Sequence, residues 1–237
     1  LLENAQKLKN VTCLAELISN EHLKPVNVIP EKNNLATAAV KTESGLKIPA
    51  NGTFYGGDFL GNGKLLLADN KNKKIVLCEV DCGPTVLQEK KLSGSPYGVC
   101  AIGENEVLVT LSDEKKVLRL DSDSLEIKDT ISLECWCYGI ATSGNITVIG
   151  TRDSVVMFSG GLEKRSATLS SDLSSTDDVS MDDENNVIYS NYYKHTVRKQ
   201  DKAGNVLFSY THEKLKSPYG LDAVSYTHLT LPTICSV

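Results

Sequence analysis

Basic and aromatic residues recur in short polar segments that separate apolar runs of the sequence. The strongest candidates for ligand contact are Lys73, Lys74, Lys115, Lys116, Arg152, Tyr193 and His195. Cationic groups beside aromatic rings suit contact with phosphate and stacking on bases, and they suit an acidic peptide equally well. Lysines are also common in solvated turns. Two interpretations therefore stay open: a basic ligand-binding face, or ordinary exposed loops.

Metal and nucleophile chemistry has little support in the sequence. Cys135 and Cys137 would share one face of a strand, but no further Cys or His stands at a metal-ligand spacing. Buried thiols acting as small hydrophobic groups are the better interpretation. There is no Gly-x-Ser-x-Gly motif, and no histidine is spaced to serve a nucleophile. We expect no metal, no cofactor and no catalytic residue.

Composition narrows the class of protein. The chain has 237 residues, a net charge of -5 and an odd number of cysteines, 7. A negative balance argues against a globally basic nucleic-acid binder, so a protein target is favoured and RNA stays possible. Cysteines without a disulfide spacing favour reduced thiols in a cytoplasmic protein. No apolar run is long enough for a membrane helix.

The sequence repeats with a period of about 40 residues. Candidate anchors are Gly57, Gly98, Gly139, Asp178 and Gly220. Ser-Pro-Tyr-Gly stands at 95–98 and again at 217–220, three periods later. Each period holds short apolar or β-branched runs between polar turns. Four strands in about 40 residues is typical of a blade in a β-propeller, so we predict an all-β propeller of four-stranded blades.

Three tyrosines precede anchor glycines: Tyr97, Tyr138 and Tyr219. Their rings could line the mouth of a central channel as contact residues, since tyrosine is favoured in interfaces. They could instead wedge between blades. The second interpretation is preferred, because a residue repeated at one position usually solves a repeated packing problem.

Two motifs carry a family resemblance. Pro96-Tyr97-Gly98-Val99 and Pro218-Tyr219-Gly220-Leu221 match a Pro-x-Gly-apolar opening, and residues 68–75 read Ala-Asp-Asn-Lys-Asn-Lys-Lys-Ile. In these segments the chain resembles the NHL repeat. Residues 38–224 resemble the C-terminal propeller of tripartite-motif (TRIM)-like proteins of invertebrates, especially molluscs. The sequence departs from that pattern at Cys135-Trp136-Cys137, where Pro is expected, and at Asp177-Asp178, where Gly is expected.

The resemblance implies a six-bladed ring that follows a RING finger, B-boxes and a coiled coil. Residues 1–24 are predicted to form a helix from their apolar spacing, either packed on the propeller or ending the coiled coil. Residues 25–37 would be a linker. Residues 38–224 would supply about four legible blades of an incomplete propeller. Residues 225–237 resemble a translated sequencing adapter, and a chain that begins with Leu1 is expected to be a fragment.

The expected function is a non-catalytic binding propeller that recruits a protein, or an RNA. By resemblance it would be the substrate-recognition end of a TRIM-like ubiquitin ligase, whose RING would hold the ligase activity. An upstream coiled coil would mediate self-association. The alternative is a six-bladed Ca²⁺-dependent lactonase-like hydrolase. That site needs acidic or amide side chains on several inner strands, and the expected inner strands at 59–60, 99–102 and 140–142 are apolar or small.

Overall fold

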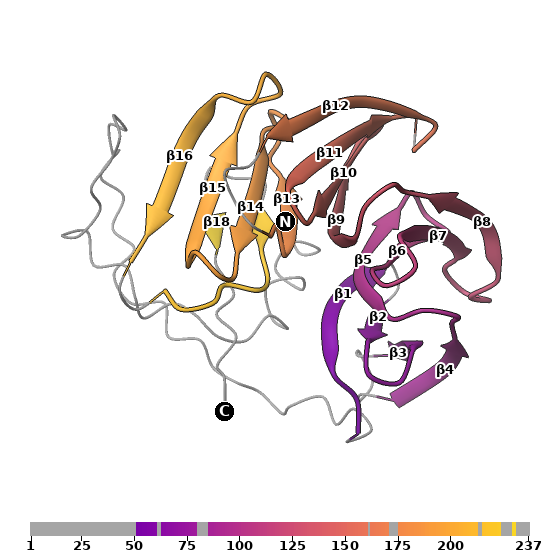
Figure 1. Ribbon diagram of the computed structural model, residues 1–237. Coiled ribbons are helices and arrows are strands. Elements are labelled where there is room, and N and C mark those ends of the chain that lie inside the picture. Colours follow the sequence, from indigo (N-terminus) through magenta and orange to yellow (C-terminus); the bar gives the residue numbers. More distant parts are fainter. Residues whose placement is uncertain are drawn as a thin grey trace.

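The computed structural model describes residues 51–60, 63–79, 85–160, 162–170, 175–212, 215–223 and 229–230. These residues form an all-β propeller of four-stranded blades (Figure 1). The predicted helix at 1–24, the linker at 25–37 and most of the tail at 225–237 lie outside this part of the chain. No helix of the described residues is long and apolar enough to cross a membrane.

Each blade is a meander of antiparallel neighbours in sequence order. Blade 1 contains β1 (Phe54–Leu60), β2 (Lys64–Asp69), β3 (Lys74–Glu79) and β4 (Thr85–Lys91). Blade 2 contains β5 (Pro96–Ile102), β6 (Glu106–Leu111), β7 (Lys116–Asp121) and β8 (Ile127–Ser132). Blade 3 contains β9 (Cys137–Ser143), β10 (Ile146–Thr151), β11 (Ser154–Ser159) and β12 (Lys164–Ser170). Blade 4 contains β13 (Asp178–Met181), β14 (Val187–Asn191), β15 (Thr196–Gln200) and β16 (Val206–Thr211).

The described residues thus form four full blades, not the six that the family resemblance implies. A short pair follows them, in which β17 (Asp222–Ala223) lies antiparallel to β18 (Leu229–Thr230). The second Ser-Pro-Tyr-Gly motif, at 217–220, lies just before β17, and the first, at 95–98, overlaps the start of β5. The two copies therefore occupy the same position in units three periods apart.

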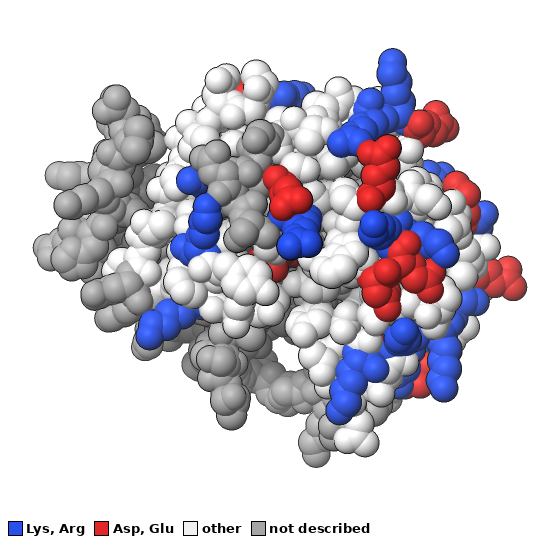
Figure 2. Space-filling view, in the orientation of Figure 1, with Lys and Arg blue, Asp and Glu red and all other residues white. Residues whose placement is uncertain are grey.

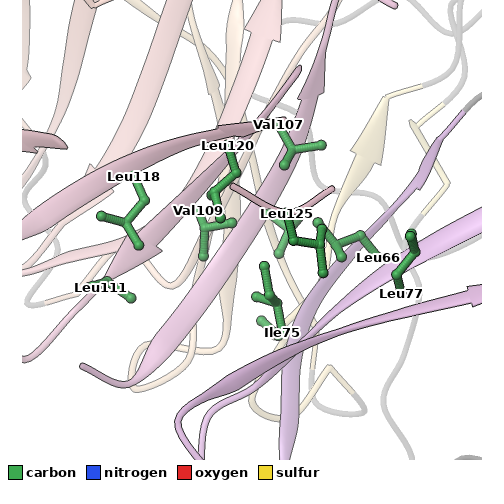
Figure 3. Close-up of a cluster of buried hydrophobic side chains, with 11 residues drawn as sticks. Leu66, Ile75, Leu77, Val107, Val109, Leu111, Leu118, Leu120 and Leu125 are labelled. Atoms are coloured by element: carbon green, nitrogen blue, oxygen red, sulfur yellow. The ribbon is translucent and has the colours of Figure 1, made fainter. Parts of the chain in front are cut away.

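The middle strands of each blade are buried on both faces, which explains their continuous apolar runs. In β6, Val107 and Val109 pack toward blade 1, whereas Leu108 packs toward blade 3. Figure 3 shows the first of these layers, with Leu66 and Leu77 of blade 1 near Leu125 of blade 2. Burying apolar surface on both faces stabilises the stack at about 25 cal/mol per Å². A single blade could not bury these faces alone.

The inner strands β1, β5, β9 and β13 lie side by side around the centre of the molecule (Figure 1). A glycine allows each close approach. A Cβ on Gly56 would stand 2.3 Å from the carbonyl oxygen of Tyr97, and one on Gly98 would stand 2.7 Å from that of Tyr138. Gly56, rather than Gly57, is therefore the equivalent of Gly98. The sequence interpretation that anchors the first repeat at Gly57 is wrong by one residue.

A candidate binding face at the centre of the propeller

Strand direction alternates within each blade, so the turns between second and third strands share one side of the propeller with the starts of the inner strands. We call this side the loop face. Lys73, Lys115 and His195 each end such a turn, with φ of 50°, 56° and 51°. Lys74 and Lys116 begin the third strands, Arg152 lies in the tighter turn of blade 3, and Tyr193 is 69% exposed in blade 4. The loop face therefore holds every predicted contact residue.

Most of the loop lysines have acidic neighbours. Nζ of Lys73 lies 3.5 Å from Asp113, that of Lys74 lies 2.7 Å from Glu89, and that of Lys116 lies 2.8 Å from Glu114. Figure 2 shows this mixture of signs across the side of the molecule where Figure 1 places β4 to β8. Such surface pairs contribute about 0–1 kcal/mol each, but they reduce the net positive charge available to an anionic ligand.

Aromatic rings dominate the centre of this face. Six tyrosines form one chain of ring contacts, which we call the tyrosine cluster: Tyr138, Tyr97, Tyr55, Tyr219, Tyr192 and Tyr193. In that order the ring centroids are 5.2, 4.9, 5.8, 4.7 and 5.2 Å apart. These spacings are typical of favourable aromatic pairs. The cluster holds six of the nine tyrosines in the chain, so most of this residue type gathers at one place on the protein.

Repeated backbone positions build the cluster. Tyr55, Tyr97, Tyr138 and Tyr219 each directly precede the glycine at which neighbouring inner strands approach, or its equivalent in the segment leading into β17. The rings pack on one another across adjacent inner strands. Tyr55 is not among the residues predicted from the sequence, because the residue that precedes the assumed anchor Gly57 is Gly56. Moving the anchor by one residue, to Gly56, makes Tyr55 the preceding residue.

Hydrogen bonds from the blades hold the inner strands that carry these rings. The buried hydroxyl of Thr110 donates to the carbonyl of Tyr138 at 2.6 Å and accepts from the amide of Gly98 at 2.8 Å. The side-chain amide of Asn70 donates to the carbonyl of Pro96 at 3.0 Å. The amide of Ser217 donates to Nδ1 of His195 at 2.9 Å. His195 thus positions the start of the segment that carries Tyr219.

Carboxylates lie beside the cluster. Asp177 takes the tyrosine position in blade 4 and is 6% exposed; it accepts from the amide of Tyr192 at 2.7 Å and from the hydroxyl of Ser175 at 3.1 Å. Burial raises the pKa of Asp177. Burial, and after it the charge of Asp177, also raises the pKa of the Tyr97 phenol, and burial raises the pKa of Tyr219 to about 12. The phenols of Tyr97 and Tyr219 therefore stay neutral near pH 7.

Two more carboxylates lie on the inner strands. Oδ2 of Asp58 accepts from the amide of Ala101 at 2.8 Å, and Oδ2 of Asp178 accepts from that of Leu221 at 2.7 Å. Both bonds satisfy an amide on the edge of the next inner strand. The sequence interpretation of the inner strands as wholly apolar or small is wrong here, because β1 begins at Phe54 and includes Asp58. Within the described ranges, no three His, Cys, Asp or Glu are grouped as metal ligands.

The thiol of Cys100 lies on β5, 3.2 Å from the hydroxyl of Thr142. Burial raises its pKa from 9.0 to about 11. The thiol is therefore neutral at pH 7 and is a weak nucleophile, since the thiolate is the reactive form.

Trp136 is more accessible: it is 47% exposed, and the Arg152 guanidinium lies 5.8 Å from its ring centroid.

The raised pKa of Cys100 predicts alkaline destabilisation. Above pH 9 the thiol ionises in the unfolded chain but stays protonated in the folded protein until about pH 11. The unfolded state then binds fewer protons, so stability falls as pH rises. We expect the free energy of unfolding, measured in urea under reducing conditions, to decline between pH 9 and pH 11, and less steeply in Cys100→Ala. Parallel curves for the two proteins would contradict the burial of this thiol.

No protein-family model and no curated protein sequence matches the chain. Solved β-propeller structures do match. A streptogramin B lyase gives a TM-score of 0.60 at 15% identity, over 74% of this chain and 60% of that one. A catalytically inactive virginiamycin B lyase from Staphylococcus aureus, solved with quinupristin, gives 0.58 at 14% identity, over 73% and 61%. Hydrazine synthase of Kuenenia stuttgartiensis gives 0.60 at 12% identity, over 79% and 56%.

At these identities the likeness shows the fold alone: the described chain is a β-propeller with repeat-like blades. It spans less than two thirds of the length of each of these proteins. The particular chemistry of a propeller depends on its site rather than its fold.

Proposed function

We propose that this chain is a non-catalytic binding propeller that recruits a protein target through the loop face. The observation that carries the proposal is the tyrosine cluster, which is assembled from repeated positions and continues to exposed rings at Tyr55 and Tyr193. Tyrosine supplies a large contact area with few torsions to immobilise, and it is enriched at binding hot spots.

The chemistry of the central polar groups also supports a binding role. The Cys100 thiol is protonated at neutral pH, because its pKa is raised. Asp58, Asp177 and Asp178 each accept a hydrogen bond from a backbone amide, so part of their bonding capacity maintains the local backbone. A Ca²⁺-dependent lactonase-like hydrolase is the alternative, and Asp58 and Asp178 are the residues that favour it. A carboxylate has about four lone-pair sites, so one amide bond to each of these groups does not by itself exclude an ion.

The finer assignment follows from the motifs at 96–99, 218–221 and 68–75. On that basis the propeller is of the six-bladed NHL type and serves a cytoplasmic TRIM-like ubiquitin ligase as its substrate-recognition end. Ligase activity would belong to a RING finger outside this chain, and self-association to an upstream coiled coil. RNA is the second ligand class, for which the exposed Lys115 and Tyr193 on the loop face would supply charge and stacking.

Selection from a random peptide library on the immobilised 237-residue protein tests the proposal. We expect peptides that bind the unmodified protein at least about tenfold more tightly than the Tyr55→Ala/Tyr193→Ala double variant, as for loss of hot-spot side chains. Tyr55 is 40% exposed and Tyr193 is 69% exposed, and neither belongs to the buried apolar layers between the blades, so the variant should fold.

Leu87→Ala is the matched control, because Leu87 is 47% exposed on the outer strand β4, away from the tyrosine cluster. It should bind the selected peptides like the unmodified protein. Recovery of no peptide would refute the protein-binding function, and equal binding by the double variant would move the site off the loop face.

A further inference from the structure

We infer that the tyrosine cluster is a receptor for a cationic side chain, and that the protein target presents a lysine, a methylated lysine or an arginine to it. This inference rests on the proposed binding function and specifies the chemistry of its ligand. It assigns the centre of the face to a positive guest, whereas the sequence pattern alone favours an acidic peptide or a phosphate.

The density of aromatic rings is the first ground. Tyr55 stacks on Tyr97 on one side, at 4.9 Å and 24° between ring planes, and on Tyr219 on the other, at 5.8 Å and 13°. Tyr192 meets Tyr219 at 50°. Tyr55 is therefore stacked on both sides, and the aromatic surface that a guest could reach is greatest at Tyr55, which is 40% exposed, and at Tyr193, which is 69% exposed. A cation within about 6 Å of a ring centroid is attracted by the negative face of the ring.

The charge beneath the rings is the second ground. The carboxylates near Tyr97 come from Asp177 and Asp178, and both raise the pKa of its phenol beyond the effect of burial, as a negative field must. Burial is the main cause that raises the pKa of Tyr219, and the charge of Asp177 acts in the same direction. The Asp177 carboxylate accepts from the amide of Tyr192 at 2.7 Å, which places it beside the cluster. A guest at the cluster therefore meets negative potential together with aromatic surface.

The engagement of the nearby cations is the third ground. Lys73, Lys74 and Lys116 are paired with Asp113, Glu89 and Glu114. The Arg152 guanidinium lies over the Trp136 ring, and this contact already shows on the same protein the kind of interaction that a guest would make. These four positive groups of the loop face are thus engaged with partners of their own, which leaves the tyrosine rings to a positively charged guest.

The decisive experiment separates charge from shape. Choline and its uncharged carbon isostere, 3,3-dimethylbutan-1-ol, are titrated into the full 237-residue protein, and binding is followed by NMR of the tyrosine ring protons. We expect choline to bind saturably and the isostere to bind about 5- to 30-fold more weakly, the range that a partly desolvated cation–π contact supplies. Tyr55→Leu should weaken choline binding by a similar factor, and Tyr55→Phe should retain it.

Tyr210→Leu is the control for a change of aromatic content alone, because Tyr210 stacks on Phe208 and His212 in blade 4 and belongs to no part of the cluster. It should bind choline like the unmodified protein. Equal affinity for choline and the isostere, or binding of neither, would overturn the cation assignment. The assignment would also be overturned if an RNA oligonucleotide displaced choline and if Tyr55→Leu bound choline as tightly as the unmodified protein.

The two proposals fail separately. If library peptides bind the cluster but choline does not, the binding function stands and the cationic guest is wrong. If choline binds and no peptide is recovered, the cation site stands and the protein target is wrong.

Discussion

Replacing Gly98 by alanine is expected to lower the free energy of unfolding by about 3 kcal/mol, the upper range for an overpacked site. The new Cβ would lie 2.7 Å from the carbonyl oxygen of Tyr138, 3.0 Å from the amide nitrogen of Ile140 and 3.1 Å from the Cα of Gly139. All three are backbone atoms of the next inner strand, so no side-chain rotation relieves the contact. Urea unfolding monitored by circular dichroism measures the loss.

Gly144→Ala separates steric from conformational cost. Gly144 has a φ of 55° and nothing within 4 Å of a Cβ, so its alanine variant should lose only the cost of a left-handed backbone, about 1 kcal/mol. If the two variants lose the same free energy, close approach of the inner strands is not what requires glycine at Gly98. Gly98→Ala should also displace Tyr97 and Tyr138, and so weaken binding at the cluster.

Asp69→Ala is expected to cost about 3 kcal/mol of stability, because truncation removes a buried acceptor and leaves three partly buried donors without it, at about 1–3 kcal/mol for each unsatisfied group before relaxation. Asp69 is 1% exposed, and its carboxylate accepts from the amides of Thr53 and Asn72 at 3.2 Å each and from Nδ2 of Asn72 at 2.7 Å. The same denaturation experiment measures the cost.

Asp201→Ala is its matched control. Asp201 also accepts three bonds, from the amides of Ala203 and Asn205 at 2.9 and 2.8 Å and from Nδ2 of Asn205 at 2.8 Å. It lies in a solvated turn, where water replaces the lost acceptor, so its loss should be clearly smaller. A loss as large as that of Asp69→Ala would show that bond number, rather than burial, sets the cost.

Much of the fold could be predicted because blades obey local rules. The interval between Gly98 and Gly139 reflects one repeated contact between inner strands. The run at Val107-Leu108-Val109 reflects burial on both faces of a sheet. Neither inference needs a distant residue. The predicted basic face was harder to judge, because the pairing of Lys73 with Asp113 joins turns of different blades, and a sequence shows that both turns are charged without showing which charges meet.

The tyrosine cluster could be predicted only in part from the sequence, for a similar reason. Tyr97, Tyr138 and Tyr219 follow the repeat, whereas Tyr192 belongs to a turn and reaches the cluster through the fold of blade 4. Asp177 also breaks the repeated residue type, so its place beside the rings follows from the backbone register rather than from its identity. The electric field and the solvent exposure at these groups depend on residues from several blades, so they could not be predicted from a single repeat.

The contact between Tyr55 and Tyr219 joins residues 164 positions apart (219 minus 55), whereas the hydrogen-bonded neighbours of every blade lie close in sequence. Closing so long a loop is entropically unfavourable until the intervening chain is ordered. This pair of rings should therefore meet late in folding, after the blades that separate it, and should part early when the protein unfolds. A molecule that binds to both rings would slow unfolding more than it speeds folding, because it stabilises an interaction absent from the transition state.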